Sequence, residues 1–194
     1  HLKEAANAVA IQIRSIGEMA INQHDQELVK YCVKEFNTLL KMGIYSGDQF
    51  SVYNLLYQYT LFVEKLIESN HKGIKKIANY FIYYGFMAEK KNLEFIMKTV
   101  FFDLSQIVEK LIDHNPKKIK SVVGLMIDVE QKIRELGNEA YSQDLLKSLV
   151  ILGMKLKERK QEIAYRALIK HFKKLSRESF NNLYTDMTSK QEKE

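Results

Sequence analysis

The side chains of this sequence best suited to chemistry are five histidines and one cysteine. Histidine nitrogen and cysteine sulfur are common zinc ligands and nucleophiles, but they act in clusters with defined spacing. No histidine here has a second histidine or a carboxylate four residues away along a helix. They fall mostly at junctions between expected helices and are predicted to be polar loop residues. The five are His1, His24, His71, His114 and His171.

Cys32 is the only cysteine, so neither a disulfide within the chain nor a multi-cysteine zinc site can form. It falls on the inner face of an expected helix, where a buried thiol packs as a small hydrophobic side chain. A chain without disulfides fits a reducing compartment, and we expect a cytoplasmic protein. Glycine-rich phosphate loops and the Gly-x-Ser-x-Gly turn of many hydrolases are also missing. The sequence therefore predicts no catalytic residue, no metal, no cofactor and no enzymatic activity.

A run of basic residues near the C-terminus is the strongest electrostatic signal. Between Lys155 and Arg177 there are nine basic and two acidic residues, a net charge of +7, while the rest of the chain sums to −1. Five basic residues at helical spacing predict one stripe: Arg159, Arg166, Lys170, Lys173 and Arg177. This basic stripe is either the solvated face of a capping helix or a surface for an anionic partner. That partner would be nucleic acid, an acidic membrane surface or an acidic protein segment.

Tyrosines gather in two neighbouring segments, YNLLYQYTLF at 53–62 and YFIYYGF at 80–86. In the second segment the aromatic side chains cover most of a helix circumference, so some of them must point outward. Tyr80, Tyr83 and Tyr84 are therefore predicted to contact a protein partner. The alternative is that they pack in the core or close a homodimer.

A thirteen-residue motif occurs twice, 45 residues apart. VEKLIESNHKGIK (63–75) and VEKLIDHNPKKIK (108–120) are identical at nine of thirteen positions. Each copy predicts the end of one helix, a polar turn and the start of the next helix. A shorter echo links IRSIGEMA (13–20) with IRELGNEA (133–140), where small residues would let helices approach closely. The lysines of the two corners predict either a groove of stacked basic turns or solvated side chains. They are Lys72, Lys75 and Lys76, and Lys117, Lys118 and Lys120.

Apolar residues recur at three- and four-residue spacing along nearly the whole chain. This pattern, with one proline and eight glycines in 194 residues, predicts an all-α fold of about eight antiparallel helices. We expect helical hairpins stacked as an α-α superhelix, with an irregular helical bundle as the alternative. The expected helices span about 2–21, 25–43, 48–69, 72–89, 92–113, 116–139, 142–157 (or from 144) and 160–175. Residues 1–175 are predicted to form one domain and 176–194 a polar, partly disordered tail.

The period of 45 and the motifs VEKLI…N.K.IK and IR.[IL]G..A resemble the HEAT and armadillo class of α-helical repeats. The resemblance implies a curved stack whose surface binds another macromolecule without catalysis. We therefore predict a non-catalytic protein-interaction or regulatory scaffold, cut from a longer protein because the chain starts at His1. One alternative is a domain that binds nucleic acid or acidic lipid through the stripe at 159–177. Another is the cytoplasmic part of a membrane-anchored protein.

Overall fold

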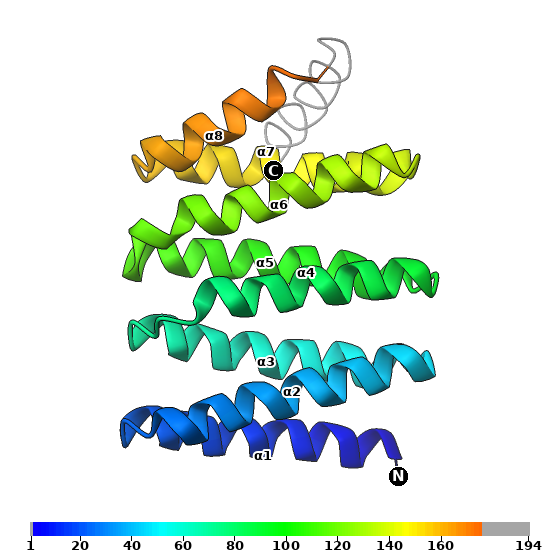
Figure 1. The fold of residues 1–194 in the computed structure, drawn as a ribbon, viewed down its shortest axis with the longest axis vertical. Helices are drawn as coiled ribbons and strands as arrows, with labels where there is room; N and C mark the ends of the chain where they lie inside the picture. Colours follow the sequence, from blue (N-terminus) through cyan, green and yellow to red (C-terminus); the bar gives the residue numbers. More distant parts are fainter. Residues whose placement is uncertain (1, 176–194) are drawn as a thin grey trace, which may run out of the picture. The chain divides into compact units, whose positions relative to one another are not determined.

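The computed structural model describes residues 2–175, with side chains from residue 5 on, and the chain divides into two compact units. Every regular element in this range is helical (Figure 1), which confirms the predicted all-α fold of helical hairpins. None of these helices is long and apolar enough to cross a membrane. The predicted single domain over 1–175 stays a prediction, and the tail over 176–194 lies outside the described residues.

Unit 1 (His1–Asn115) contains five helices and unit 2 (Pro116–Glu194) contains three helices and a 3₁₀ turn within the described range. In unit 1 they are α1 (Leu2–Asn22), α2 (Gln26–Ser46), α3 (Gln49–Glu68), α4 (Ile74–Lys90) and α5 (Glu94–His114). In unit 2 they are η1 (Pro116–Lys118), α6 (Ile119–Glu135), α7 (Glu139–Glu158) and α8 (Glu162–Phe172).

Unit 1 is built from two layers, with α1, α3 and α5 side by side in one and α2 and α4 in the other (Figure 1). Consecutive helices run antiparallel because their connections are short, so α2 and α4 run parallel. A stack of buried rings joins the layers. The ring of Tyr59 lies 4.8 Å from that of Phe36 on α2 and 5.1 Å from that of Phe81 on α4. Each such pair adds about 0.5–1.5 kcal/mol beyond the burial of its area.

A residue in the left-handed conformation follows most helices and determines where the next one begins. This residue ends the preceding helix. The residue after it donates its N–H to the carbonyl five positions earlier, as the His71 N–H does to the Leu66 carbonyl at 2.9 Å. The backbone angle φ lies between 55° and 77° at all of these residues, which are His24, Gly47, Asn70, Asn92, Gly137 and Lys160. Glycine and asparagine adopt this conformation at little cost, which is why they occur in these turns.

The repeated motif forms a helix–turn–helix corner in both copies, but the two turns differ. The first copy joins α3 to α4 through Asn70, with φ of 58°. In the second copy the equivalent residue, Asn115, has φ of −150°. Proline at 116 replaces His71 and has no N–H to close the same turn. Proline also disfavours a helical residue before it, so the 3₁₀ turn η1 precedes α6.

Equivalent residues of the two copies contact each other within unit 1. The Asn115 amide donates a hydrogen bond to Asn70 Oδ1 at 3.2 Å. Lys110 and its equivalent Lys65 both pair with Glu68, at 2.6 and 2.9 Å, and hold the pKa of that carboxyl at about 2. Contacts between positions 45 residues apart are those expected when helical repeats stack in register.

Other predictions about local structure were wrong. The shorter echo is not a structural repeat, because Gly17 lies inside α1 against Phe62 whereas Gly137 forms the turn after α6. The second helix does not end near residue 43, since Gly47 closes it and α2 continues to Ser46. The seventh helix begins at Glu139, ahead of both predicted starts. The side chain of Asn138 caps it by accepting from the Tyr141 N–H at 3.5 Å.

Candidate functional site

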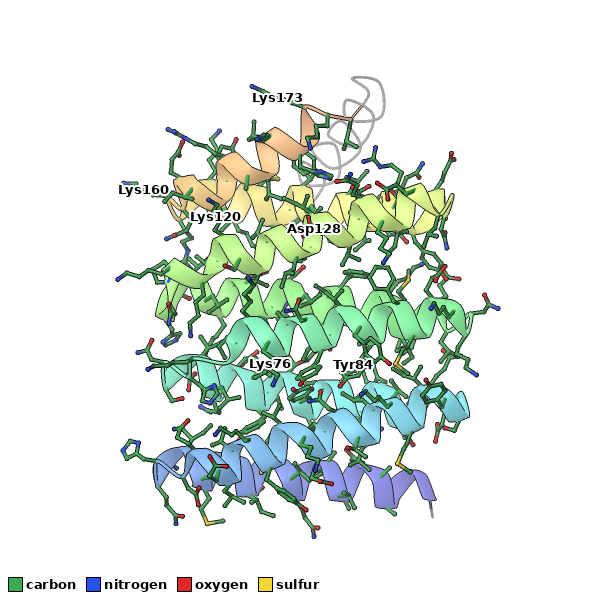
Figure 2. All side chains as sticks on the ribbon, viewed as in Figure 1. Lys76, Tyr84, Lys120, Asp128, Lys160 and Lys173 are labelled. Carbon is green, nitrogen blue, oxygen red and sulfur yellow. The ribbon has the colours of Figure 1, made fainter. Side chains whose placement is uncertain are left out.

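A groove of about 790 Å³ lies between α2 and α4 in unit 1. It is lined by four turns of α2 and by the corner and first turns of α4, and we call it the α2–α4 groove. Five lysines line it: Lys30, Lys34, Lys41, Lys72 and Lys76. Figure 2 shows Lys76 and Tyr84 on the side of α4 that faces α2. The first three lysines were missed in the sequence, although their spacing along α2 places them on one helix face.

Most of the positive charge of the groove is not neutralised by the residues that the structure describes around it. None of its lining residues is acidic. Lys30 pairs with Glu27 at 2.6 Å, but no described carboxylate lies within ion-pair distance of the other four lysines. Elsewhere in unit 1, Lys65, Lys98 and Lys110 each pair with a glutamate. The α2–α4 groove is therefore a local surplus of four positive charges, which favours an anion.

Local backbone structure explains how these lysines come to face the groove. The Asp25 carboxylate caps α2, accepting from the N–H groups of Glu27 and Leu28 at 3.1 and 3.0 Å, and so starts the helix that carries three of the lysines. Helix α4 begins without a side-chain cap, after a turn in which the Gly73 N–H donates to His71 Nδ1 at 3.0 Å. Lysines near such an N-terminus oppose the helix dipole by a few tenths of a kcal/mol each, and a bound anion would relieve this repulsion.

The predicted tyrosine contacts have different positions in the structure. Tyr80 lines the groove and lies under the ammonium group of Lys76, 6.0 Å from its ring centre. Tyr83 is exposed and lies under Lys41 at 5.3 Å. Tyr84 is fully buried, so it cannot contact a partner directly as predicted. Lysine side chains of α2 and α4 therefore lie over tyrosine rings of α4, far along the sequence from the basic stripe.

Tyr84 instead supports the groove from below. Its hydroxyl donates a hydrogen bond to Oδ1 of Asn37, a buried residue that lines the groove. Burial raises the pKa of Tyr84, and also that of neighbouring Tyr59, so both hydroxyls stay protonated. The contact fixes the Asn37 side chain and holds α2 against α4.

The predicted basic stripe lies on unit 2 and is less coherent than the groove. Arg159 caps the end of α7, and Arg166 pairs with Glu162 at 2.8 Å, so its charge is matched by a neighbouring carboxylate. Lys170 and Lys173 are exposed, and Arg177 lies outside the described residues. Ile163 is 69% exposed, because α8 turns its Ala164 and Leu168 side inward. A role for the stripe in binding remains a prediction.

A buried polar cluster holds α8 to α6 and α7 in unit 2. Glu130 of α6 is completely buried. Its carboxylate accepts from the Ser142 hydroxyl at 2.6 Å and lies 2.7 Å from His171 Nε2 and 3.3 Å from Arg134 Nε. The ring N–H of His171 is not aligned with this oxygen well enough for an ordinary hydrogen bond. Burial alone would raise the pKa of Glu130, but His171, Ser142 and Arg134 outweigh it and hold the pKa below its ordinary value.

Other chemistry-bearing side chains are structural. His171 was predicted to be a polar loop residue, and this is wrong, because it lies within α8 and is buried beside Glu130. Cys32 is buried as predicted, and burial raises the pKa of its thiol. Asp103 of α5 is also buried, and burial raises its pKa to about 7, although the neighbouring Thr60 hydroxyl lowers it. Among the residues that the structure describes, no group of three histidine, cysteine or carboxylate side chains could hold a metal ion.

Comparison with known proteins places the fold in a class. No protein-family model matches the chain, and no curated protein matches it. A solved structure described as a circular tandem repeat protein with novel repeat topology and enhanced subunit contact surfaces is similar, with a TM-score of 0.55 and 16% identity. The match covers 95% of this chain and 46% of that chain, so this chain spans about half its length. At this identity the likeness shows the fold alone, which is an α-helical repeat architecture.

Proposed function

We propose that this chain is a non-catalytic protein-interaction module, a HEAT- or armadillo-like scaffold that binds an anionic segment of a partner protein in the α2–α4 groove. The single observation that carries the proposal is the unneutralised charge of the groove. Lys34, Lys41, Lys72 and Lys76 face one recess without a carboxylate. Repulsion among these lysines is a cost that folding alone does not explain and that an acidic partner would offset.

The make-up of the groove also supports binding over catalysis. Nucleophilic or acid–base catalysis needs an activated side chain with a partner within hydrogen-bond reach. In the groove, His71 Nδ1 is engaged by the Gly73 N–H, and Asn37 is engaged by Tyr84. The remaining polar side chains are mainly lysines. Such a surface attracts and orients a charged partner.

Binding of labelled polyglutamate, followed by fluorescence anisotropy at about 50 and about 200 mM salt, tests this proposal. We expect binding that weakens as salt rises. The variant Lys34→Ala/Lys72→Ala/Lys76→Ala should bind about tenfold more weakly or worse. The control Lys75→Ala/Lys90→Ala/Lys120→Ala removes the same charge from exposed lysines outside the groove and should retain most of the affinity. Equal losses in the two variants, or no binding at the lower salt, would contradict the proposal.

A second candidate function is polyanion binding through the basic stripe, which the exposed side chains of Lys170 and Lys173 favour. Nucleic acid or acidic lipid would then bind unit 2 with steep salt dependence. Lys170→Glu/Lys173→Glu should abolish binding of single-stranded DNA or of phosphatidylserine vesicles in that case. The same variant should leave polyglutamate binding intact if the α2–α4 groove is the functional surface.

A further inference from the structure

The α2–α4 groove is apolar at its floor as well as basic at its rim. Val33 of α2 and Tyr80 of α4 are half-buried and expose part of their apolar surface there, whereas the lining residues Val29 and Ile77 are fully covered. On α2, Val33 is followed directly by the rim lysine Lys34, and on α4 Tyr80 lies one helical turn after the rim lysine Lys76. Each helix therefore offers the groove one apolar contact beside a positive charge.

The dimensions of this surface suit a short stretch of polypeptide. Residues from Gln26 to Lys41 line the α2 side. At 1.5 Å per residue they span about 22 Å, the length of about four helical turns or six to seven extended residues. Parallel to it, α4 contributes Lys76 and Tyr80, and the corner before α4 contributes Lys72. A segment lying along the groove would meet positive charge on both sides.

We infer that the α2–α4 groove binds an acidic, amphipathic peptide segment of its partner, with apolar side chains against the part-exposed Val33 and Tyr80 and carboxylates against the lysine rim. This rests on the proposed function and specifies its ligand. The arrangement corresponds to helix-in-groove recognition, in which apolar anchors give affinity and flanking charges give register and specificity.

Nucleic acid fits the groove less well. Single strands are usually held by bases stacked on aromatic rings or arginine planes. The groove exposes one aliphatic side chain, Val33, and one aromatic ring, Tyr80, which already lies under Lys76 at 6.0 Å. The five cations are all lysines, which lack the planar fork with which arginine binds phosphate in two places. Carboxylates spaced along a peptide helix can each pair with a single ammonium group, which the lysines of the rim supply at similar intervals.

Two labelled peptides of about 14 residues test the inference, since a helix of that length spans about 21 Å. One carries leucine at every third or fourth position and glutamate elsewhere, and in the other serine replaces each leucine. Wild-type protein should bind the leucine peptide at least about tenfold more tightly than the serine peptide. Val33→Ser should reduce this preference, whereas Val9→Ser, at an exposed valine of α1, should not. Hydrogen exchange on the wild-type complex should slow across residues 26–41 and 72–80, which needs no variant.

The outcomes separate this inference from the proposed function. Equal affinity for the two peptides, with binding still lost in Lys34→Ala/Lys72→Ala/Lys76→Ala, would overturn the apolar floor and leave an anion-binding groove. Slowed exchange elsewhere than α2 and α4 would overturn the location. Binding of neither peptide at about 50 mM salt would overturn both proposals. If single-stranded DNA alone bound, the ligand would be a nucleic acid and both proposals would fail.

Discussion

Replacing Glu130 by alanine should open α8 and destabilise unit 2 severely. The carboxylate is completely buried and contacts Ser142 at 2.6 Å and His171 at 2.7 Å. Removing it leaves the Ser142 hydroxyl without its acceptor and the buried His171 ring without its neighbouring carboxylate, at about 1–3 kcal/mol each, more if the group is charged. Arg134 is 41% exposed and loses little because water can solvate it. The sum, about 2–6 kcal/mol, brackets the usual cost of about 3–5 kcal/mol for breaking a buried pair by removing one partner.

Hydrogen exchange of the α8 segment (Glu162–Phe172) measures this loss without assuming how the two units unfold. A decrease of about 3–5 kcal/mol in the opening free energy accelerates exchange by more than about a hundredfold. Glu135→Ala is the matched control, because Glu135 is exposed on the same helix and should change stability by less than about 0.5 kcal/mol. If exchange in α8 were the same in the Glu130 variant and the control, the cluster would not hold α8.

The same cluster and unit 1 give three further expectations. The folded state lowers the pKa of Glu130, so the stabilisation by its carboxylate is full above the ordinary value of 4.5 and is lost as pH falls through the lowered pKa. In Glu130→Gln, the opening free energy of α8 should therefore depend less on pH in this acidic range, as hydrogen exchange measures. The pKa of Asp103 is raised from 3.8 to about 7, so unit 1 loses stability as pH rises across that interval. In urea titrations, Asp103→Asn should therefore be more stable than wild type at about pH 8, by at most about 4 kcal/mol. At about pH 3.5 the two proteins should be equally stable. Gly17→Ala should lower the thermal midpoint by a cost of about 1–3 kcal/mol, because the new Cβ would lie 2.5 Å from a ring carbon of the buried Phe62, and an unchanged midpoint would show that the ring moves aside.

Local signals in the sequence predicted the helices well. Apolar spacing of three and four located them, and the repeated VEKLI motif located two corners. Helix ends were less certain, because both Gly43 and Gly47 are plausible stops and only the turn geometry selects Gly47. Capping by Asn138 was overlooked because Gly137, beside it, was read as a close-packing residue instead of a turn. These errors arise where two local signals compete within a few residues.

The candidate site was predicted only in part, because it depends on contacts between distant segments. Tyr80 and the corner lysines Lys72 and Lys76 were identified from the sequence, but their neighbours on α2 were not. Lys34 and Lys76 are 42 residues apart, and no local pattern places them across one groove. Glu130 and His171 are separated by 41 residues, so their contact was equally invisible. Helical periodicity gives the face of a residue, whereas the repeat packing decides which faces meet.

The most direct test of the central claim is a charge swap in the α2–α4 groove. The variant Lys34→Glu/Lys72→Glu/Lys76→Glu should fold, because all three side chains are exposed and glutamate suits the N-terminus of α4 better than lysine does. Anisotropy titrations at about 50 mM salt should show that wild type binds polyglutamate and not polylysine, and that the variant has the reverse preference. A folded variant that kept the wild-type affinity for polyglutamate would show that acidic polypeptides bind elsewhere and would contradict the account.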